Sequence, residues 1–187
     1  MKGKQIHVAL VAVVFMWGGV FLANSKLLAK MDAAQVVTIR FSLISVAFIG
    51  IFIASPSLRP RLSRKQTGVL LIAGALAVPG AQLPIVEGQK YLSPALVAVF
   101  VTLAPIWAAV ISTIYLKERF KPLQSIGFIL AFGGSVIVIL TGTGDGDLTV
   151  DNRWGAALAM LTPICWAAYT VISKPLTTQL LPITAVG

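Results

Sequence analysis

Long apolar stretches alternate with short polar ones along this chain. Each apolar stretch is about 20 residues long, enough for a helix to cross a hydrocarbon core of roughly 30 Å. Because backbone polar groups in lipid must be satisfied within the segment, the pattern predicts an all-α, polytopic membrane helix bundle. The six predicted spans cover residues 6–28, 33–54, 67–86, 93–116, 123–140 and 154–173.

Proline positions predict breaks in two of these spans. Pro105 lies in the middle of the fourth span and should kink it. Pro79 and Pro84 should break the third span near its outer end. Broken helices often line cavities in transporters, and irregular packing is the alternative explanation. Ser93 and Pro94 fit the cap and the first position of the fourth helix.

Lysine and arginine residues gather in alternate connections between the predicted spans. The N-terminus and the second and fourth connections are rich in them, whereas the first, third and fifth connections hold one each. This positive-inside pattern predicts a cytoplasmic N-terminus. The N-terminal lysines also resemble the start of a signal peptide. However, the stretch 6–28 is longer than a typical signal-peptide core, so we interpret it as an uncleaved first span.

The composition agrees with a membrane protein. Apolar residues make up 57% and charged residues 11% of the chain, and the mean hydropathy is +0.91, so lipid must cover part of its surface. The net charge of +9 does not indicate nucleic-acid binding, because the basic residues sit at the ends of apolar stretches. Their expected partner is the anionic inner leaflet of the bilayer.

Residues typical of catalysis or metal binding are sparse. Cys165 is the single cysteine and His7 the single histidine, and no Asp or Glu lies deep in a predicted span. The sequence therefore predicts neither a metal centre nor a cofactor, and it does not indicate an enzyme.

An internal repeat is visible around two tryptophans. Residues 15–19 (Phe-Met-Trp-Gly-Gly) resemble residues 164–168 (Ile-Cys-Trp-Ala-Ala), and each segment is followed by a Ser-Lys pair. If the sixth span restarts the first, the repeat holds five helices, and the second copy is inverted in the membrane. The expected organisation is a first repeat over 1–141, an outer loop over 142–152 and the start of the second repeat over 153–187.

Several local motifs occur in an order and spacing that resembles the EamA type of the drug/metabolite transporter superfamily. The motifs are Trp17-Gly18-Gly19, Arg40-Phe41, Leu92-Ser93-Pro94 through Pro105 to Leu116-Lys117-Glu118-Arg119, Gly127 with Gly133-Gly134, and Trp166-Ala167-Ala168-Tyr169. The resemblance implies ten helices in two inverted halves around a central cavity, in a bacterial inner membrane. It also implies export of small metabolites, amino acids or drugs by alternating access.

The chain carries about six of those ten helices. We therefore expect either that the C-terminal half is missing, or that a half-size protein assembles with itself or with a partner. The strong charge bias argues against the dual orientation of small multidrug transporters. A membrane subunit that does not transport is a third possibility.

The resemblance places the first, third, fourth and sixth helices around the cavity. Trp17, Trp166 and Tyr169 are therefore candidates to face a small-molecule substrate, and packing is the alternative role for the tryptophans. Asn24 and Gln82 carry amides at membrane depth, so each should face substrate or bond across helices.

Two further positions are expected near the broken helices. Thr102 lies one turn before Pro105, where bonding to a carbonyl freed by the kink is favoured over ligand binding. Arg40 lies about two turns into the second span, where an arginine is costly unless it is paired. We predict an ion pair between Arg40 and Glu87, at the outer end of the third span. The alternative is that Arg40 reaches the outer headgroups.

Overall fold

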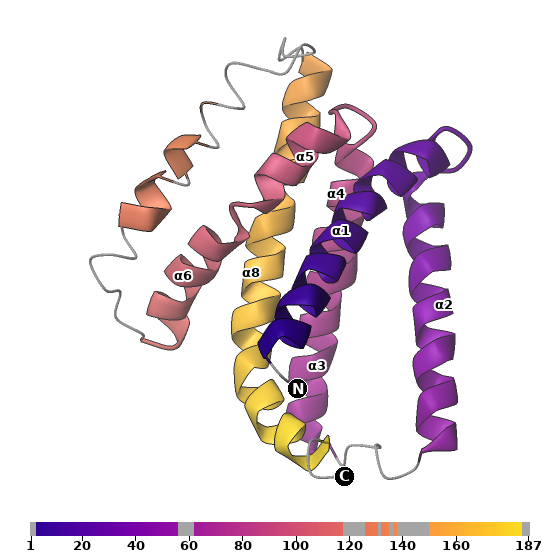
Figure 1. Cartoon of the computed structure of the whole chain (residues 1–187), viewed down its shortest axis with the longest axis vertical. Coiled ribbons are helices and arrows are strands. Elements are labelled where there is room, and N and C mark those ends of the chain that lie inside the picture. The colour runs from indigo at the N-terminus through magenta and orange to yellow at the C-terminus, as the bar shows by residue number, and fades with distance from the viewer. Residues whose placement is uncertain are drawn as a thin grey trace.

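The chain forms a helical bundle, seen in a computed structural model (Figure 1). Five segments are long and apolar enough to cross a membrane, and they coincide with the first, second, third, fourth and sixth predicted spans. The predicted polytopic α-helical fold is thus confirmed. The fifth predicted span, 123–140, lies mostly outside the described residues. The structure describes residues 3–55, 62–117, 126–130, 132–134, 137 and 150–184, and these contain no β-strand.

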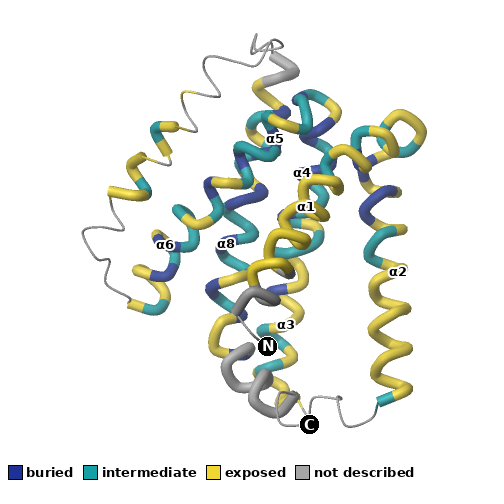
Figure 2. Tube along the Cα trace, viewed as in Figure 1, coloured by how far each residue is buried: buried dark blue, intermediate teal, exposed yellow. Residues whose placement is uncertain are grey.

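The first two helices form a hairpin at one side of the bundle. They are α1 (Gly3–Leu28) and α2 (Ala33–Ala54), and a short turn joins them. In that turn the backbone N–H of Asp32 donates to Oε1 of Gln35 over 3.0 Å, which fixes the start of α2. Most described residues of both helices are exposed (Figure 2), and the majority of these exposed residues are apolar. Such a surface suits lipid or further apolar helices rather than water.

The third span is one continuous path with a widened turn in its middle. It runs through α3 (Arg64–Ala77), the π-helical turn η2 (Val78–Gln82) and α4 (Leu83–Gly88). The backbone N–H of Leu83 bonds back to the carbonyl of Val78, five residues earlier. Pro79 explains the widening, because it has no N–H to donate and its ring crowds the preceding turn. The predicted break near Pro79 and Pro84 therefore takes the form of a π-turn.

The fourth span is broken into two helices, as Pro105 predicts. Its parts are α5 (Pro94–Val101) and α6 (Ala104–Tyr115). Oγ of Ser93 accepts a bond from the backbone N–H of Leu96 over 3.2 Å, which confirms the predicted cap with a proline in the first turn.

The last helix, α8 (Val150–Thr184), is the centre of the bundle. It packs against α3, η2, α4, α5 and α6, and it runs in the direction opposite to α1 (Figure 1). Two glycines permit this close packing. A Cβ built on Gly80 would lie 3.2 Å from Sγ of Cys165 in α8, and one built on Gly155 would lie 2.6 Å from Cβ of Tyr91. Helix α8 can therefore approach both the π-turn and the turn after α4.

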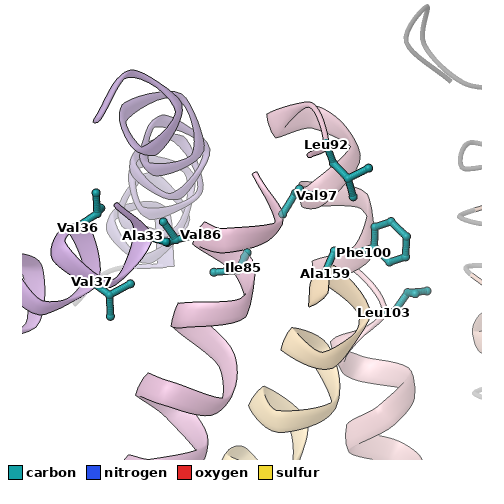
Figure 3. Close-up of a cluster of buried hydrophobic side chains, with 10 residues drawn as sticks. All are labelled: Ala33, Val36, Val37, Ile85, Val86, Leu92, Val97, Phe100, Leu103 and Ala159. Atoms are coloured by element: carbon teal, nitrogen blue, oxygen red, sulfur yellow. The ribbon is translucent and has the colours of Figure 1, made fainter. Parts of the chain in front are cut away.

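The buried apolar core lies toward one end of the bundle. It joins the start of α2, the end of α4, the α5 region and the first part of α8 (Figure 3). Away from this region, most of the described residues of α1 and α2 are exposed (Figure 2). We call the following residues the core cluster: Ala33, Val36, Val37, Ile85, Val86, Leu92, Val97, Phe100, Leu103 and Ala159.

Candidate functional site

A pocket of about 240 Å³ lies among α1, α2, η2, α4, α5 and α8. Several polar side chains line this pocket, although it lies inside the apolar spans, where polar side chains are rare. Its wall is mostly aromatic and aliphatic, as in typical small-molecule sites. The residues that line it are Trp17, Val20, Phe21, Asn24, Arg40, Phe41, Ile44, Gln82, Ile85, Val101, Thr162 and Trp166.

Two tryptophans related by the internal repeat meet in this pocket. The ring centroids of Trp17 in α1 and Trp166 in α8 are 5.9 Å apart, with an angle of 72° between the ring planes. This edge-to-face geometry is one of the favoured arrangements of aromatic pairs. Tyr169 packs against Trp166, and their ring centroids are 5.5 Å apart. Tyr169 does not line the pocket itself. The structure thus places the two predicted tryptophans at the pocket and Tyr169 behind them.

A cationic group and an amide face each other across two helices. Nη2 of Arg40 in α2 donates a hydrogen bond to Oε1 of Gln82 in the π-turn. The guanidinium carbon of Arg40 also lies 5.3 Å from the ring centroid of Phe41. The Arg40 side chain is partly buried, and both Arg40 and Gln82 line the pocket. The structure therefore brings these two predicted residues together.

The predicted ion pair between Arg40 and Glu87 is wrong for the described residues. Glu87 instead pairs with Lys90, whose Nζ lies 2.9 Å from its Oε2, and the same Nζ lies 3.7 Å from Oδ1 of Asp32. Glu87 is five residues beyond Gln82, or about 7.5 Å along a helix, so it lies past the level that Arg40 reaches. The hydrogen bond from Lys90 to Glu87 raises the pKa of Lys90 above its ordinary value, against a smaller opposing effect of burial.

The remaining predicted residues divide between the pocket and the helix break. Asn24 is 4% exposed and lines the pocket. Thr102 does not line the pocket. Its hydroxyl donates to the carbonyl of Val99 over 2.6 Å, at the break between α5 and α6. Asn24 can therefore contact a ligand, whereas the hydroxyl of Thr102 bonds to the backbone at the helix break.

Sequence reasoning missed several pocket residues, and some of them could have been found from their spacing to predicted ones. Phe21 is four residues after Trp17, and Thr162 is four residues before Trp166, so each shares a helix face with its tryptophan. Phe41 adjoins Arg40. The hydroxyl of Thr162 donates to the carbonyl of Ala81 over 3.1 Å, which ties α8 to the π-turn that carries Gln82.

The pocket therefore combines a mostly apolar wall with a few polar groups. Asn24 and Gln82 supply amides, Arg40 supplies a positive charge, and Thr162 supplies a hydroxyl. This arrangement suits recognition of a small molecule with both an apolar and a polar part. The guanidinium and the two amides are not general bases or nucleophiles of the usual kinds, and the hydroxyl of Thr162 donates to the backbone carbonyl of Ala81.

Comparison with known proteins points to membrane transport. The model of the EamA-like transporter family matches residues 5–140. An uncharacterized transporter of Archaeoglobus fulgidus is 27% identical over 95% of this chain and 60% of its own length. The uncharacterized inner membrane transporter YhbE of Escherichia coli is 29% identical over 88% of this chain and 52% of its own length.

A third relative has a more specific name. A probable terminal-alkyne amino-acid exporter of Streptantibioticus cattleyicolor is 23% identical over 94% of this chain and 57% of its own length. The chain thus spans between 52% and 60% of the length of these curated relatives. No solved structure matches the chain.

Proposed function

Because this chain belongs to the EamA-like transporter family, we propose that its pocket is the cargo site of a membrane transporter. The observation that carries the proposal is the gathering of Trp17, Arg40, Gln82 and Trp166 from four elements at one place inside the apolar spans. Polar side chains within a membrane generally face a cavity or a pathway, because lipid cannot solvate them. Broken helices commonly line such sites, and η2 supplies one here.

The arrangement of α1 and α8 supports the inverted repeat. These helices run in opposite directions (Figure 1). Their equivalent tryptophans are in ring contact, as expected if an axis relating the two copies passes between Trp17 and Trp166. The family match over residues 5–140 agrees with a first repeat over 1–141, followed by the outer loop and a second repeat that starts at 153.

Alternating access is the mechanism that this geometry favours. The core cluster closes one end of the bundle, and Lys90 links the α1–α2 turn to the end of α4 through Asp32 and Glu87. The charge pattern assigns this end to the outer face, with the N-terminus in the cytoplasm. In this arrangement the outer side is closed, and cargo enters the pocket from the cytoplasm.

Export of a small polar or amphipathic metabolite, amino acid or drug fits this pocket. Its volume of about 240 Å³ lies just below the roughly 300–1,000 Å³ range of small-molecule sites, so a small cargo fits it best. One relative is named a probable terminal-alkyne amino-acid exporter, which supports a small cargo of this kind. The relative YhbE, named an inner membrane transporter, agrees with a multi-pass protein of the bacterial inner membrane.

Export can be tested by comparing the metabolites in the medium of cells that produce the protein or a variant. We expect at least one small metabolite to accumulate outside cells with the unchanged protein. Trp166→Ala should reduce its export about tenfold or more, because aromatic anchors dominate small-molecule and protein binding energies. Trp154→Ala is the matched control, since Trp154 lies in the same helix, is 58% exposed and does not line the pocket.

The amount of each variant in the membrane is measured in parallel, and Trp166→Phe keeps an aromatic ring if the alanine variant is unstable. Export that Trp166→Phe retains and Trp166→Ala loses supports the cargo site. Equal export by Trp166→Ala and Trp154→Ala, at equal protein levels, would place the cargo elsewhere. No metabolite above the level of cells without the protein would contradict the transport function.

A further inference from the structure

The Arg40 guanidinium is positioned to bind an anion. It lies in α2, inside a predicted span, and its only hydrogen bond among the described residues is to the neutral amide of Gln82. A guanidinium has five N–H donors, so this bond leaves most of them unused. The nearby ring of Phe41 favours a cation but cannot accept these N–H bonds in the plane of the guanidinium.

No carboxylate within the described chain neutralises this charge. Glu87 and Asp32, the acidic residues nearest the closed end of the bundle, both pair with Lys90. Charged side chains inside a membrane are normally paired, so an arginine that lines a pocket without an acidic partner indicates that the partner comes from outside the described residues. The pocket gives that partner a route to the guanidinium.

The other side chains of the pocket complement an anion that carries an apolar body. Asn24 is buried and lines the same pocket, so its amide N–H group can donate to the same anion. On the other side, Trp17 and Trp166 offer aromatic surface for an apolar group. A carboxylate is the natural match for Arg40, because its two oxygens can accept two parallel N–H bonds from one guanidinium.

We propose that Arg40 binds the carboxylate of an anionic cargo, and that Gln82 positions the guanidinium for this contact. The inference rests on the proposed function and adds the chemical class of the cargo: a small monocarboxylate with an apolar or aromatic body. The π-turn contributes because it sets Gln82 opposite α2, and Thr162 holds that turn from α8. Gln82 is thus a positioning residue, and Arg40 is the recognition residue.

The test uses a pair of probes with nearly the same shape, phenylpropionate and phenylpropionamide, of which only the first is charged. Their binding to the protein in phosphatidylcholine vesicles is measured by equilibrium dialysis, and binding to empty vesicles is subtracted. We expect the unchanged protein to bind the carboxylate at least about tenfold more tightly than the amide, as is typical for a hydrogen bond to a charged group.

Two variants test the role of Arg40 in different ways. Arg40→Gln should weaken carboxylate binding to the level of the amide, while amide binding changes little. Gln82→Glu keeps Arg40 and gives it an internal carboxylate, so it should also abolish the preference without leaving an unpaired charge. Lys26→Gln is the matched control, because it removes a positive charge from an exposed position of α1 outside the pocket, and the preference should remain.

Different failures have different meanings. Equal affinity of the unchanged protein for both probes, or an unchanged preference in Arg40→Gln and Gln82→Glu, would overturn the anion site while leaving the pocket as a cargo site. Binding of neither probe would contradict both the anion site and the proposed cargo site. Loss of carboxylate binding when phosphatidylglycerol is added to the vesicles would assign Arg40 to a lipid headgroup, which also overturns the proposal.

Discussion

Gly155→Val is expected to destabilise the protein by about 2 kcal/mol or more, because overpacking a well-packed contact typically costs about 1–3 kcal/mol. A Cβ at this position would lie 2.6 Å from Cβ of Tyr91 and 3.1 Å from Cγ of Leu92. The Cβ of Tyr91 is fixed to the backbone and cannot rotate away. Helix α8 would therefore have to move away from the turn after α4, which is itself held by a bond of 3.0 Å from the N–H of Leu92 to the carbonyl of Gly88.

The loss is measured as a fall in the thermal unfolding midpoint of the purified protein in detergent. Gly50→Val is the matched control, because Gly50 lies inside α2 and a Cβ built there meets no atom within 4 Å. Its effect should stay within about 0.5 kcal/mol, as for substitutions away from packed contacts. Equal midpoints for the two variants would show that α8 does not pack on the turn as described.

Replacing either tryptophan of the pair should weaken ligand binding about tenfold. Aromatic pairs contribute about 0.5–1.5 kcal/mol beyond the area that they bury, and about 1.4 kcal/mol corresponds to a factor of ten. The neutral probe phenylpropionamide isolates this effect, because it makes no charge contact with Arg40. Trp17→Ala and Trp166→Ala together should weaken its binding by less than the product of the single effects, since each ring supports the other.

The control for this prediction is again Trp154→Ala, which changes a tryptophan of α8 outside the pocket. Its affinity for the amide should match that of the unchanged protein. If the two single effects multiply without any coupling, the rings do not act together on the ligand. If Trp154→Ala weakens binding as much as Trp166→Ala, the pocket is not the site of binding.

The sequence predicts the spans and the helix breaks well because their causes are local. Apolar length determines which segments can cross a membrane, and five predicted spans have described counterparts. The breaks near Pro79 and Pro105 follow from the chemistry of proline. The form of the first break could not be predicted, because a proline can be accommodated by a kink, a π-turn or an interruption, and tertiary packing decides among them.

The partners of Arg40 were harder to predict because they depend on how helices rotate against each other. Charge alone favoured Glu87, whereas the structure places Gln82 opposite Arg40 and gives Glu87 to Lys90. The pairing with Lys90 is local and could have been recognised, since residues three apart on a helix or its continuing turn are neighbours. The contact with Gln82 depends on the π-turn, which shifts the side chains that follow it around the helix axis.

The tryptophan pair shows what a repeat adds to such reasoning. Trp17 and Trp166 are far apart in the sequence, and neither hydropathy nor charge brings them together. Their equivalence in the repeat singled them out, and their contact then follows if they lie near the axis that relates the two copies. Thr102 and Tyr169 lie outside the pocket lining because proximity in sequence to a break or an aromatic anchor does not determine which way a side chain faces.

The central claim is that a cargo pocket exists inside the bilayer between α1, α2 and α8, and labelling of single cysteines tests it most directly. In a Cys165→Ala background, Ile44→Cys places a thiol in the pocket, and Leu43→Cys places one on a 67% exposed position of α2 outside the pocket lining. The protein in vesicles is treated with a maleimide, which reacts with the ionised thiol and so needs water at the site. We predict that Ile44→Cys is labelled and that phenylpropionamide slows its labelling, while Leu43→Cys stays unlabelled in lipid. Equal labelling at both positions, or labelling at Ile44→Cys that the probe does not slow, would contradict the account.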